Sequence, residues 1–367
     1  MTTKLKIFLL LALMTLTLPV AAAEILPTIQ WQPQSLRLVA EKGCYARIIR
    51  LQNGEILCCY QRAKQCRIKR SLDEGKTWID ETCVTSYKKG IAANPELLQL
   101  KNGRLMLCYN ERPNDPENHF TIMVVFSSDN GASWSKAEKI FEAGHNFGEG
   151  CWEPAPLQYP DGEIQIFFAN EASYTYSNEQ EISVIRSKDN GENWQGPKTL
   201  SYRTDNRDGM PVPCLLNDGK TVVVAIEDNG LNGPMKPVIL RDTLYNRWQT
   251  NIIKGNSKQR ESALLKPLPK HIYAGAPYIR QMPSSITVLS IQSRERRAYE
   301  EPAVYVGDRH ARNFTNRTYP LKLASEVEGS WNSLFVKDAE TVTLISTTQL
   351  NGKKGIWIID GTIETTK

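Results

Sequence analysis

The sequence is poor in the residues that build metal centres and has little excess charge of either sign. It has only four histidines, scattered at positions 119, 145, 271 and 310. There is no Cys-x-x-Cys pair and no His/Cys cluster, so we expect no metal site and no cofactor. Lys and Arg total 45 against 40 for Asp and Glu, an excess too small to indicate a nucleic-acid partner or an anionic surface.

Long apolar runs are also missing, apart from one near the N-terminus. Two lysines precede an apolar run over residues 7–18, and three alanines follow at 21–23. This order is typical of a secretory signal peptide, and the run is shorter than the roughly 20 residues that span a membrane. No cysteine follows it, which argues against a lipid anchor. We expect a signal peptide over residues 1–23, cleavage before Glu24, and a secreted or periplasmic protein that is not held in a membrane.

Cysteine is absent from the second part of the chain, because all eight cysteines lie in the first 214 residues. In an exported chain disulfide bonds among them are allowed, but eight cysteines permit 105 pairings and the sequence does not choose among these. Cys58 and Cys59 would point to opposite faces of a strand, so we do not expect both to be bridged.

One short pattern, Ser-x-Asp-x-Gly-x-x-Trp, is present three times, at 71–78, 127–134 and 187–194. Ser and Asp side chains bond to nearby backbone, Gly supplies a positive φ, and Trp packs the turn onto its own unit. This pattern is called the Asp-box. Its period near 60 residues implies stacked similar units.

The chain contains six such units, of which only three keep an intact box. Each has two β-rich segments joined by a turn, as expected for a hairpin; the turn positions are Gly54, Gly103, Gly162, Gly219, Ser285 and Ala339. No linker or low-complexity tract interrupts the series. The sequence predicts an all-β fold, a single six-bladed β-propeller over residues 24–367, with residues 35–39 closing the last blade. A monomer is favoured, although the sequence does not decide the oligomeric state.

Strand direction places the candidate chemistry at one end of this propeller, away from the boxes. The first strand of a blade starts, and its second strand ends, at the same mouth, whereas the boxes join the third and fourth strands at the other end. Nine residues before each turn position stand Tyr45, Asn94, Glu153, Met210, Ala276 and Ser330. Eight residues after a turn position stand Glu111 and Glu227.

Glu153 and Glu227 are the predicted catalytic pair. Glu153 stands between Trp152 and Pro154, an apolar setting that raises the pKa of a carboxyl group as a general acid requires. Glu227 follows a five-residue apolar run at a strand end. Two carboxylates at one mouth are what glycoside hydrolysis needs. The plain alternative is that these are solvated strand-end glutamates.

Ten further residues near the mouth are predicted to bind substrate: Arg47, Asn94, Glu96, Glu111, Trp152, Arg207, Asp208, Tyr278, Trp331 and Asn332. For some of them a structural role is equally open. Arg47 could instead form a salt bridge with Glu96 or Glu153, and Arg207 and Asp208 could belong to an internal ion pair. The two tryptophans could simply pack with one edge exposed.

At family level the chain resembles sialidase-like Asp-box (BNR) propellers, and most of all the exo-α-1,5-L-arabinanases of glycoside hydrolase family 93. The similar stretches are YARIIRLQNGEIL, ANPELLQLKNGRL, GCWEPAPLQYPDGEIQIFFANE, RDGMPVPCLLNDGKTVVVAIED and WNSL. The resemblance implies retaining hydrolysis of an arabinan or a related oligo- or polysaccharide, with Glu153 and Glu227 as the catalytic carboxylates in unassigned roles. It also implies an assisting tyrosine, for which Tyr278 is the best-placed candidate.

Two other functions remain open on sequence grounds. An exo-sialidase needs three arginines for the substrate carboxylate and a tyrosine nucleophile. Arg47 resembles the first of these arginines, but no other mouth position carries one, and Arg280 is two residues further along its strand. A non-catalytic glycan-binding propeller is the third class, and only the carboxylate pair argues against it.

Overall fold

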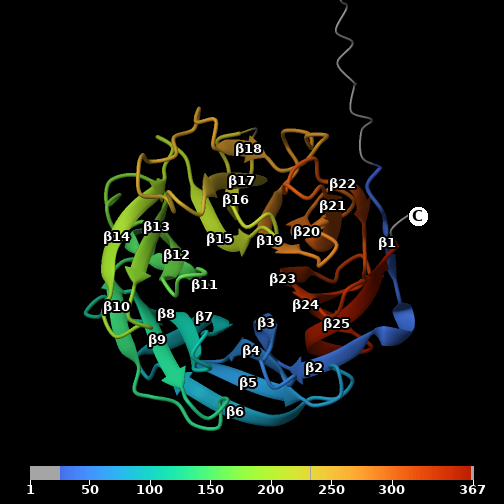
Figure 1. Cartoon of the computed structure of the whole chain (residues 1–367), viewed down its shortest axis with the longest axis horizontal. Helices are drawn as coiled ribbons and strands as arrows, with labels where there is room; N and C mark the ends of the chain where they lie inside the picture. The colour runs from blue at the N-terminus through green and yellow to red at the C-terminus, as the bar shows by residue number, and fades with distance from the viewer. Residues whose placement is uncertain (1–24, 232, 365–367) are drawn as a thin grey trace, which may run out of the picture.

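Six antiparallel sheets stand around a common axis in the computed structural model, which describes residues 25–231 and 233–364 (Figure 1). The innermost strands of the six sheets are β3, β7, β11, β15, β19 and β23 (Figure 1). The predicted all-β, six-bladed propeller is confirmed. The expected signal peptide lies outside the described residues. Within those residues, no helix has the length and apolar character needed to cross a membrane.

The first three blades each contain four consecutive strands. Blade one contains β3 (Cys44–Arg50), β4 (Ile56–Arg62), β5 (Gln65–Ser71) and β6 (Ile79–Ser86). Blade two contains β7 (Gly90–Gln99), β8 (Leu105–Pro113), β9 (Thr121–Ser127) and β10 (Glu138–Glu142). Blade three contains β11 (Cys151–Gln158), β12 (Ile164–Asn170), β13 (Glu181–Ser187) and β14 (Gln195–Ser201).

Blades four and five repeat this order, and blade six uses both ends of the chain. Blade four contains β15 (Asp208–Leu215), β16 (Thr221–Asp228), β17 (Lys236–Thr243) and β18 (Arg260–Ser262). Blade five contains β19 (Ala274–Gln281), β20 (Thr287–Ser293), β21 (Glu301–Gly307) and β22 (Thr315–Thr318). Blade six contains β23 (Gly329–Val336), β24 (Thr341–Leu350), β25 (Lys353–Ile363), β1 (Ile29–Trp31) and β2 (Arg37–Glu41). Two short 3-10 helices lie at Pro33–Ser35 and Phe147–Glu149.

The ring is closed by the N-terminal segment. Both β1 and β2 pair antiparallel with β25, and Figure 1 shows the N-terminal strands beside the C-terminal ones. A closing strand was predicted over residues 35–39, and β2 begins two residues later. This pairing covers the edge of blade six. It also brings the N-terminal and C-terminal strands into one sheet, so the ring closes only when both ends of the chain are in place.

The Asp-boxes form the predicted turns between the third and fourth strands. In the first box the Ser71 hydroxyl accepts a hydrogen bond from Gly75 N–H (2.8 Å), and Gly75 has φ 76°. Asp73 Oδ1 accepts a hydrogen bond from Thr77 N–H (2.8 Å). Bonds from the Thr77 backbone and hydroxyl hold the pKa of Asp73 at about 2. The boxes therefore stabilise the end of the propeller opposite the mouth.

Blades pack on one another through strands that are apolar on both faces. Along β16, Val222, Val224 and Ile226 join the core shared with blades two and three, whereas Val223 and Ala225 join the core shared with blades five and six. This alternation follows from the strand period of two. It explains the five-residue apolar run, which ends at the mouth.

Each innermost strand carries a β-bulge at the mouth, and its first bulged residue has a left-handed backbone. These residues are Tyr45, Asn94, Glu153, Met210, Ala276 and Trp331, with φ between 47° and 54°. A non-glycine residue in this region costs on the order of 1–3 kcal/mol and is often found at functional sites. In blade six this residue is Trp331 and not the Ser330 that the sequence predicted. The prediction counted nine residues back from Ala339, which is not the equivalent of the other turn residues.

All eight cysteines are free thiols, so none of the pairings that the sequence left open is present. Six are buried, and burial raises the pKa of the Cys58 and Cys59 thiols. Their thiols therefore pack as small apolar side chains.

Candidate active site

Glu153 lies in the bulge of β11 with its side chain 15% exposed. Burial raises the pKa of Glu153 to about 7, the guanidinium of Arg112 opposes the rise, and the negative charge of Glu227 adds to it. Glu153 Oε1 and Arg112 Nη2 are 3.8 Å apart. A carboxyl group with this pKa is protonated in a large fraction of molecules near neutral pH, as a proton donor must be.

Arg112 links Glu153 to two of the predicted substrate contacts. Its guanidinium donates a hydrogen bond to Asn94 Oδ1 and lies 4.8 Å from the ring centre of Trp152. Trp152 is itself 5% exposed and donates from Nε1 to Glu171 Oε2 at 2.9 Å. Asn94 and Trp152 thus hold Arg112 in place beside Glu153. Of the two roles that the sequence left open for Trp152, substrate contact or packing, its burial favours packing.

Glu227 extends from the end of β16 toward blade five. It accepts a hydrogen bond from Ala276 N–H at 2.8 Å. Burial raises the pKa of Glu227, whereas this hydrogen bond and the charge of Arg207 oppose the rise. Backbone donation and a nearby cation both stabilise the ionised form, which is the form a nucleophile needs.

Two glycines make room for the Glu227 carboxylate. A Cβ at Gly275 would lie 2.4 Å from Glu227 Oε2, and a Cβ at Gly209 would lie 3.0 Å from Glu227 Oε1. Both glycines immediately precede the left-handed residue of their strands. A Cβ at Gly275 would displace the carboxylate or the Tyr273 hydroxyl, and a Cβ at Gly209 would crowd both Gln180 and Glu227.

Tyr273 is a neighbour of Glu227 that the sequence did not single out. A Cβ at Gly275 would also lie 2.5 Å from Tyr273 Oη, so the two oxygens flank one small volume. Burial and the Glu227 charge raise the pKa of Tyr273, so its hydroxyl stays protonated. Gln292 Nε2 donates to that hydroxyl at 3.0 Å.

The predicted assisting tyrosine, Tyr278, belongs instead to a buried ionic cluster. Its hydroxyl donates to Glu96 Oε1 at 2.9 Å, and Arg47 Nε donates to Glu96 Oε2 at 2.9 Å. Arg280 donates to the Tyr278 hydroxyl. Arg47, Glu96 and Tyr278 are 2%, 6% and 1% exposed. The sequence left Glu96 and Glu153 open as salt-bridge partners of Arg47, and the structure shows the salt bridge with Glu96. In this conformation none of the three is open to a ligand.

Arg207 and Asp208 are adjacent in sequence but lie in different surroundings. The Arg207 guanidinium bonds to Glu171 and, at 3.0 Å, to the Asn178 carbonyl, and its side chain is 32% exposed. Asp208 was predicted to contact a ligand, but it is 0% exposed, so the prediction needs correction. Arg260 Nη1 (2.8 Å) and the Ser201 hydroxyl (2.7 Å) bond to its carboxylate. Asp208 thus holds blade four together.

Glu111 is a second correction, and it has a clear cause in the strand register. The hairpin turn of blade two closes from Leu100 N–H to Arg104 O, whereas that of blade four closes one residue later, from Leu216 N–H to Thr221 O. The residue equivalent to Glu227 is therefore Asn110, which pairs with Ala93 as Glu227 pairs with Gly209. Glu111, the next residue, therefore lies on the opposite face of β8.

The contacts of Glu111 are hydroxyl groups. The Tyr109 and Thr121 hydroxyls lie 3.5 Å and 3.4 Å from its carboxylate oxygens. Burial raises the pKa of Glu111, and these two hydrogen bonds oppose the rise. Its carboxylate is thus partnered within blade two.

Blade six contributes one exposed and one buried member of the predicted set. Trp331 is 37% exposed, and its ring centre lies 6.0 Å from that of Tyr45. Asn332 is 2% exposed, and neither atom of its amide has a hydrogen-bond partner among the described residues. Only Trp331 offers a ligand an open face.

Sequence reasoning missed Arg112, Tyr273 and Glu171. Arg112 lies on the same face of β8 as Asn110, the residue equivalent to Glu227. Counting forward from each hairpin turn with the length of that turn taken into account would have pointed to this face instead of the face of Glu111. Tyr273 lies before β19, in a loop that has no repeat position to mark it. Glu171 directly follows β12, but only the structure shows that it receives Trp152, Gln180 and Arg207.

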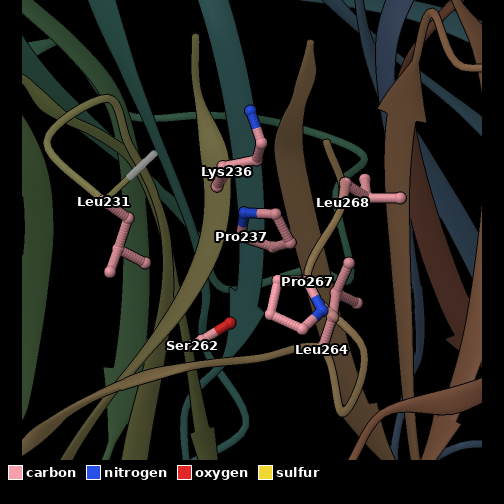
Figure 2. A pocket seen from close by; sticks show the side chains of 7 residues that line it. All are labelled: Leu231, Lys236, Pro237, Ser262, Leu264, Pro267 and Leu268. Atoms are coloured by element: carbon pink, nitrogen blue, oxygen red, sulfur yellow. The ribbon is translucent and has the colours of Figure 1, made fainter. Parts of the chain in front are cut away.

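A separate hollow of about 320 Å³ lies in blade four, near blade five (Figure 2). It is lined by Leu231, Lys236, Pro237, Ser262, Leu264, Pro267 and Leu268. The Lys236 amine points away from the apolar side chains in Figure 2 and donates to three backbone carbonyls. No predicted site residue lines this hollow. Over the described residues, no group of three or more His, Cys, Asp or Glu side chains is arranged to hold a metal ion.

Several solved structures of sugar-cleaving enzymes have a fold similar to that of this chain. An α-L-arabinofuranosidase from Fusarium graminearum, in complex with an iminosugar inhibitor, is 17% identical with a TM-score of 0.68, over 92% of this chain and 97% of the other. An α-L-arabinanase from Penicillium chrysogenum, complexed with arabinobiose, is 18% identical with a TM-score of 0.60, over 92% and 97%. A sialidase from Streptococcus pneumoniae is 10% identical with a TM-score of 0.58, over 89% and 70%. These likenesses show the fold alone.

Sequence comparison gave one family and no individual relative. No curated protein matches the chain. The family model of the BNR repeat-like domain matches residues 59–248 and 116–296, which together span more than half of the chain. Those residues include the three Asp-boxes, Glu153 and Glu227. The chain therefore belongs to the BNR repeat-like domain family.

Proposed function

We propose that the protein is an exo-acting, retaining glycoside hydrolase that cleaves α-1,5-linked L-arabinan or a related plant or microbial glycan. The observation that carries this proposal is the carboxylate pair at the mouth. Glu153 and Glu227 lie on neighbouring blades, and the charge of Glu227 contributes to a Glu153 pKa of about 7. Two carboxyl groups with different environments match the acid and the nucleophile of such a reaction.

The environments assign the two roles. Glu153, protonated near neutral pH, donates its proton to the leaving glycosidic oxygen. Burial raises the pKa of Glu227, and the hydrogen bond from Ala276 N–H and the charge of Arg207 favour its carboxylate form, which attacks the anomeric carbon and forms a glycosyl ester. Glu153 then takes a proton from water, which attacks the same carbon and releases the sugar with its configuration retained.

Tyr273 is the tyrosine that we propose to assist this reaction, in place of Tyr278. Its hydroxyl shares the space above Gly275 with Glu227 Oε2, whereas Tyr278 is bound to Glu96. A protonated hydroxyl there can donate a hydrogen bond to the nucleophile or to a substrate oxygen.

An exo-sialidase is less well supported. Arg47 is 2% exposed and its charge is already paired with Glu96, so it is not free to form a bidentate pair with a substrate carboxylate. A sialidase also needs a tyrosine nucleophile. Tyr278, the tyrosine beside Arg47, is 1% exposed and its hydroxyl is bonded to Glu96 and Arg280, so it is not open to a substrate.

Product analysis tests the proposed function. Purified protein would be incubated with linear arabinan and, separately, with a sialoside, and the products separated by size. We expect release of a short arabinose oligomer from arabinan and no free sialic acid. Free sialic acid would support the sialidase instead, and no product from either substrate would favour a glycan-binding role. Export with cleavage before Glu24 is part of this proposal, because polymeric arabinan lies outside cells.

Arg112 should set the alkaline limb of the pH profile. The general acid must be protonated, so kcat/KM should fall as pH rises through the Glu153 pKa of about 7. Arg112 lowers that pKa, so in Arg112→Met it should rise and the alkaline limb should move to higher pH. Arg112→Lys keeps the positive charge and should leave the limb close to that of the wild type. An unchanged or lower limb in Arg112→Met, with folding intact, would contradict the role of Glu153 as the acid.

A further inference from the structure

A hollow of about 750 Å³ opens at the mouth between blades one, five and six. We name it the blade-six groove, and it is lined by Lys42, Tyr299, Glu328, Trp331, Thr348 and Lys354, among others. Of the predicted site residues, only Trp331 borders it. Its other lining residues have no role in the chemistry proposed above.

Two aromatic side chains stand exposed along this groove. Trp331 is 37% exposed and Tyr299 is 47% exposed. Rigid, amphipathic rings of this kind bind well to ligands that have both apolar faces and polar edges. Sugar rings have that character, with C–H groups on their faces and hydroxyls at their edges.

The backbone of Trp331 is fixed by the surrounding structure. Its backbone is left-handed, with φ 54°, a conformation that persists only where neighbours enforce it. The Trp331 N–H donates to Gln292 Oε1 at 2.9 Å, and Arg47 Nη1 bonds to its carbonyl at 3.4 Å. The backbone that carries the exposed ring is thus fixed by bonds on both sides of the residue.

Gln292 joins the groove to the candidate active site. Its Oε1 accepts from Trp331 N–H, and its Nε2 donates to the hydroxyl of Tyr273, beside Glu227. On the other side, the Trp331 ring packs near Tyr45, whose environment includes the charge of Glu153. Trp331 therefore borders the groove and is linked through Gln292 and Tyr45 to residues near the two carboxylates.

The charges around the groove are balanced. Lys42 and Lys354 are offset by Glu326 and Glu328, all of them exposed lining residues. A site for a polyanionic glycan would instead carry an excess of cations. The lining therefore suits an uncharged saccharide.

We propose that the blade-six groove binds sugar residues beyond those held by Glu153 and Glu227, so that the substrate is an uncharged oligosaccharide or polymer that extends past Trp331 to Tyr299. This inference rests on the proposed function and names the length and charge of its substrate. Short glycosides would reach the carboxylates but leave the groove empty.

Binding and turnover measured separately test this proposal. In the Glu227→Gln background, titration calorimetry with arabinobiose through arabinohexaose should show affinity rising with chain length. Adding Tyr299→Ala should weaken arabinohexaose binding by about tenfold, the loss expected for one well-packed aromatic contact, and leave arabinobiose binding unchanged. Tyr299→Phe keeps the ring and should bind like the parent. Tyr245→Ala removes an exposed tyrosine (97%) from the opposite end of the propeller and should change nothing.

The outcomes separate the groove from the reaction. Affinity that does not depend on chain length, or an equal effect of Tyr299→Ala on short and long ligands, would overturn the groove even if the wild type cleaves arabinan. Affinity that rises with length and falls in Tyr299→Ala would support the groove even if the wild type cleaves nothing. In that last case the proposed hydrolysis fails alone.

Discussion

Glu153→Gln is expected to lower kcat on linear arabinan by roughly 10²–10⁴-fold, the contribution usual for a positioned acid or base, and Glu227→Gln, which loses the nucleophile, by at least as much. Gln keeps the size and hydrogen-bonding shape of Glu but can neither donate the catalytic proton nor attack carbon. Turnover that is unchanged in both variants would leave only a binding role for the mouth.

Azide distinguishes the two glutamates in the matching alanine variants. In Glu227→Ala, azide can occupy the space of the lost nucleophile and attack in one step, so the glycosyl azide should have inverted configuration. In Glu153→Ala the ester still forms on Glu227, so attack by azide should give a product of retained configuration. The opposite pattern would exchange the two roles.

Stability provides the control for these variants. A carboxyl group whose pKa is raised in the folded state stabilises the protein at low pH, and that contribution is lost as pH rises from the unfolded pKa through the folded one. For Glu153 the folded value is about 7. Glu153→Gln should therefore raise the free energy of unfolding at or above neutral pH by up to about 3 kcal/mol. A lower stability in denaturant titration would show that lost activity reflects lost folding.

Gly275→Ala is expected to lower kcat by about 100-fold, the cost that follows when a reacting group is misplaced by about 1 Å. The added Cβ would meet Glu227 Oε2 at 2.4 Å and Tyr273 Oη at 2.5 Å, so one or both groups must move. No chemical group is removed by this change. The effect should appear in kcat with the protein still folded.

Gly148→Ala is the matched control for this substitution. A Cβ at Gly148 meets nothing within 4 Å, so its kinetics should equal those of the wild type. A Gly275→Ala protein that is folded and has wild-type kcat would show that the position of Glu227 does not govern the reaction.

The fold could be predicted because its signals are local and repeated. The Asp-boxes and the hairpin turns each depend on a few adjacent residues, and their spacing alone gives six blades. The prediction lost accuracy where the repeat degenerates, as at Ala339, which shifted the mouth position of blade six from Trp331 to Ser330. It also failed where one hairpin turn is longer by a residue, which equated Glu111 with Glu227.

The candidate site could be predicted in part, for a different reason. Glu153 and Glu227 stand at strand ends, where topology dictates direction. The burial of Asp208 by Arg260, and the approach of Tyr273 to Glu227, depend on contacts between segments far apart in the sequence. Counting along a strand cannot find such contacts, because it gives the position of a residue along its strand and not the residues from other segments that lie beside it.

The central claim is that Glu227 attacks the sugar and Glu153 serves first as acid and then as base. The most direct test is proton NMR of the first product released from a linear arabino-oligosaccharide, recorded before its anomers interconvert. Two successive displacements predict that the product has the same anomeric configuration as the substrate. A product of inverted configuration would contradict the claim, because a single displacement by water needs no bond to Glu227.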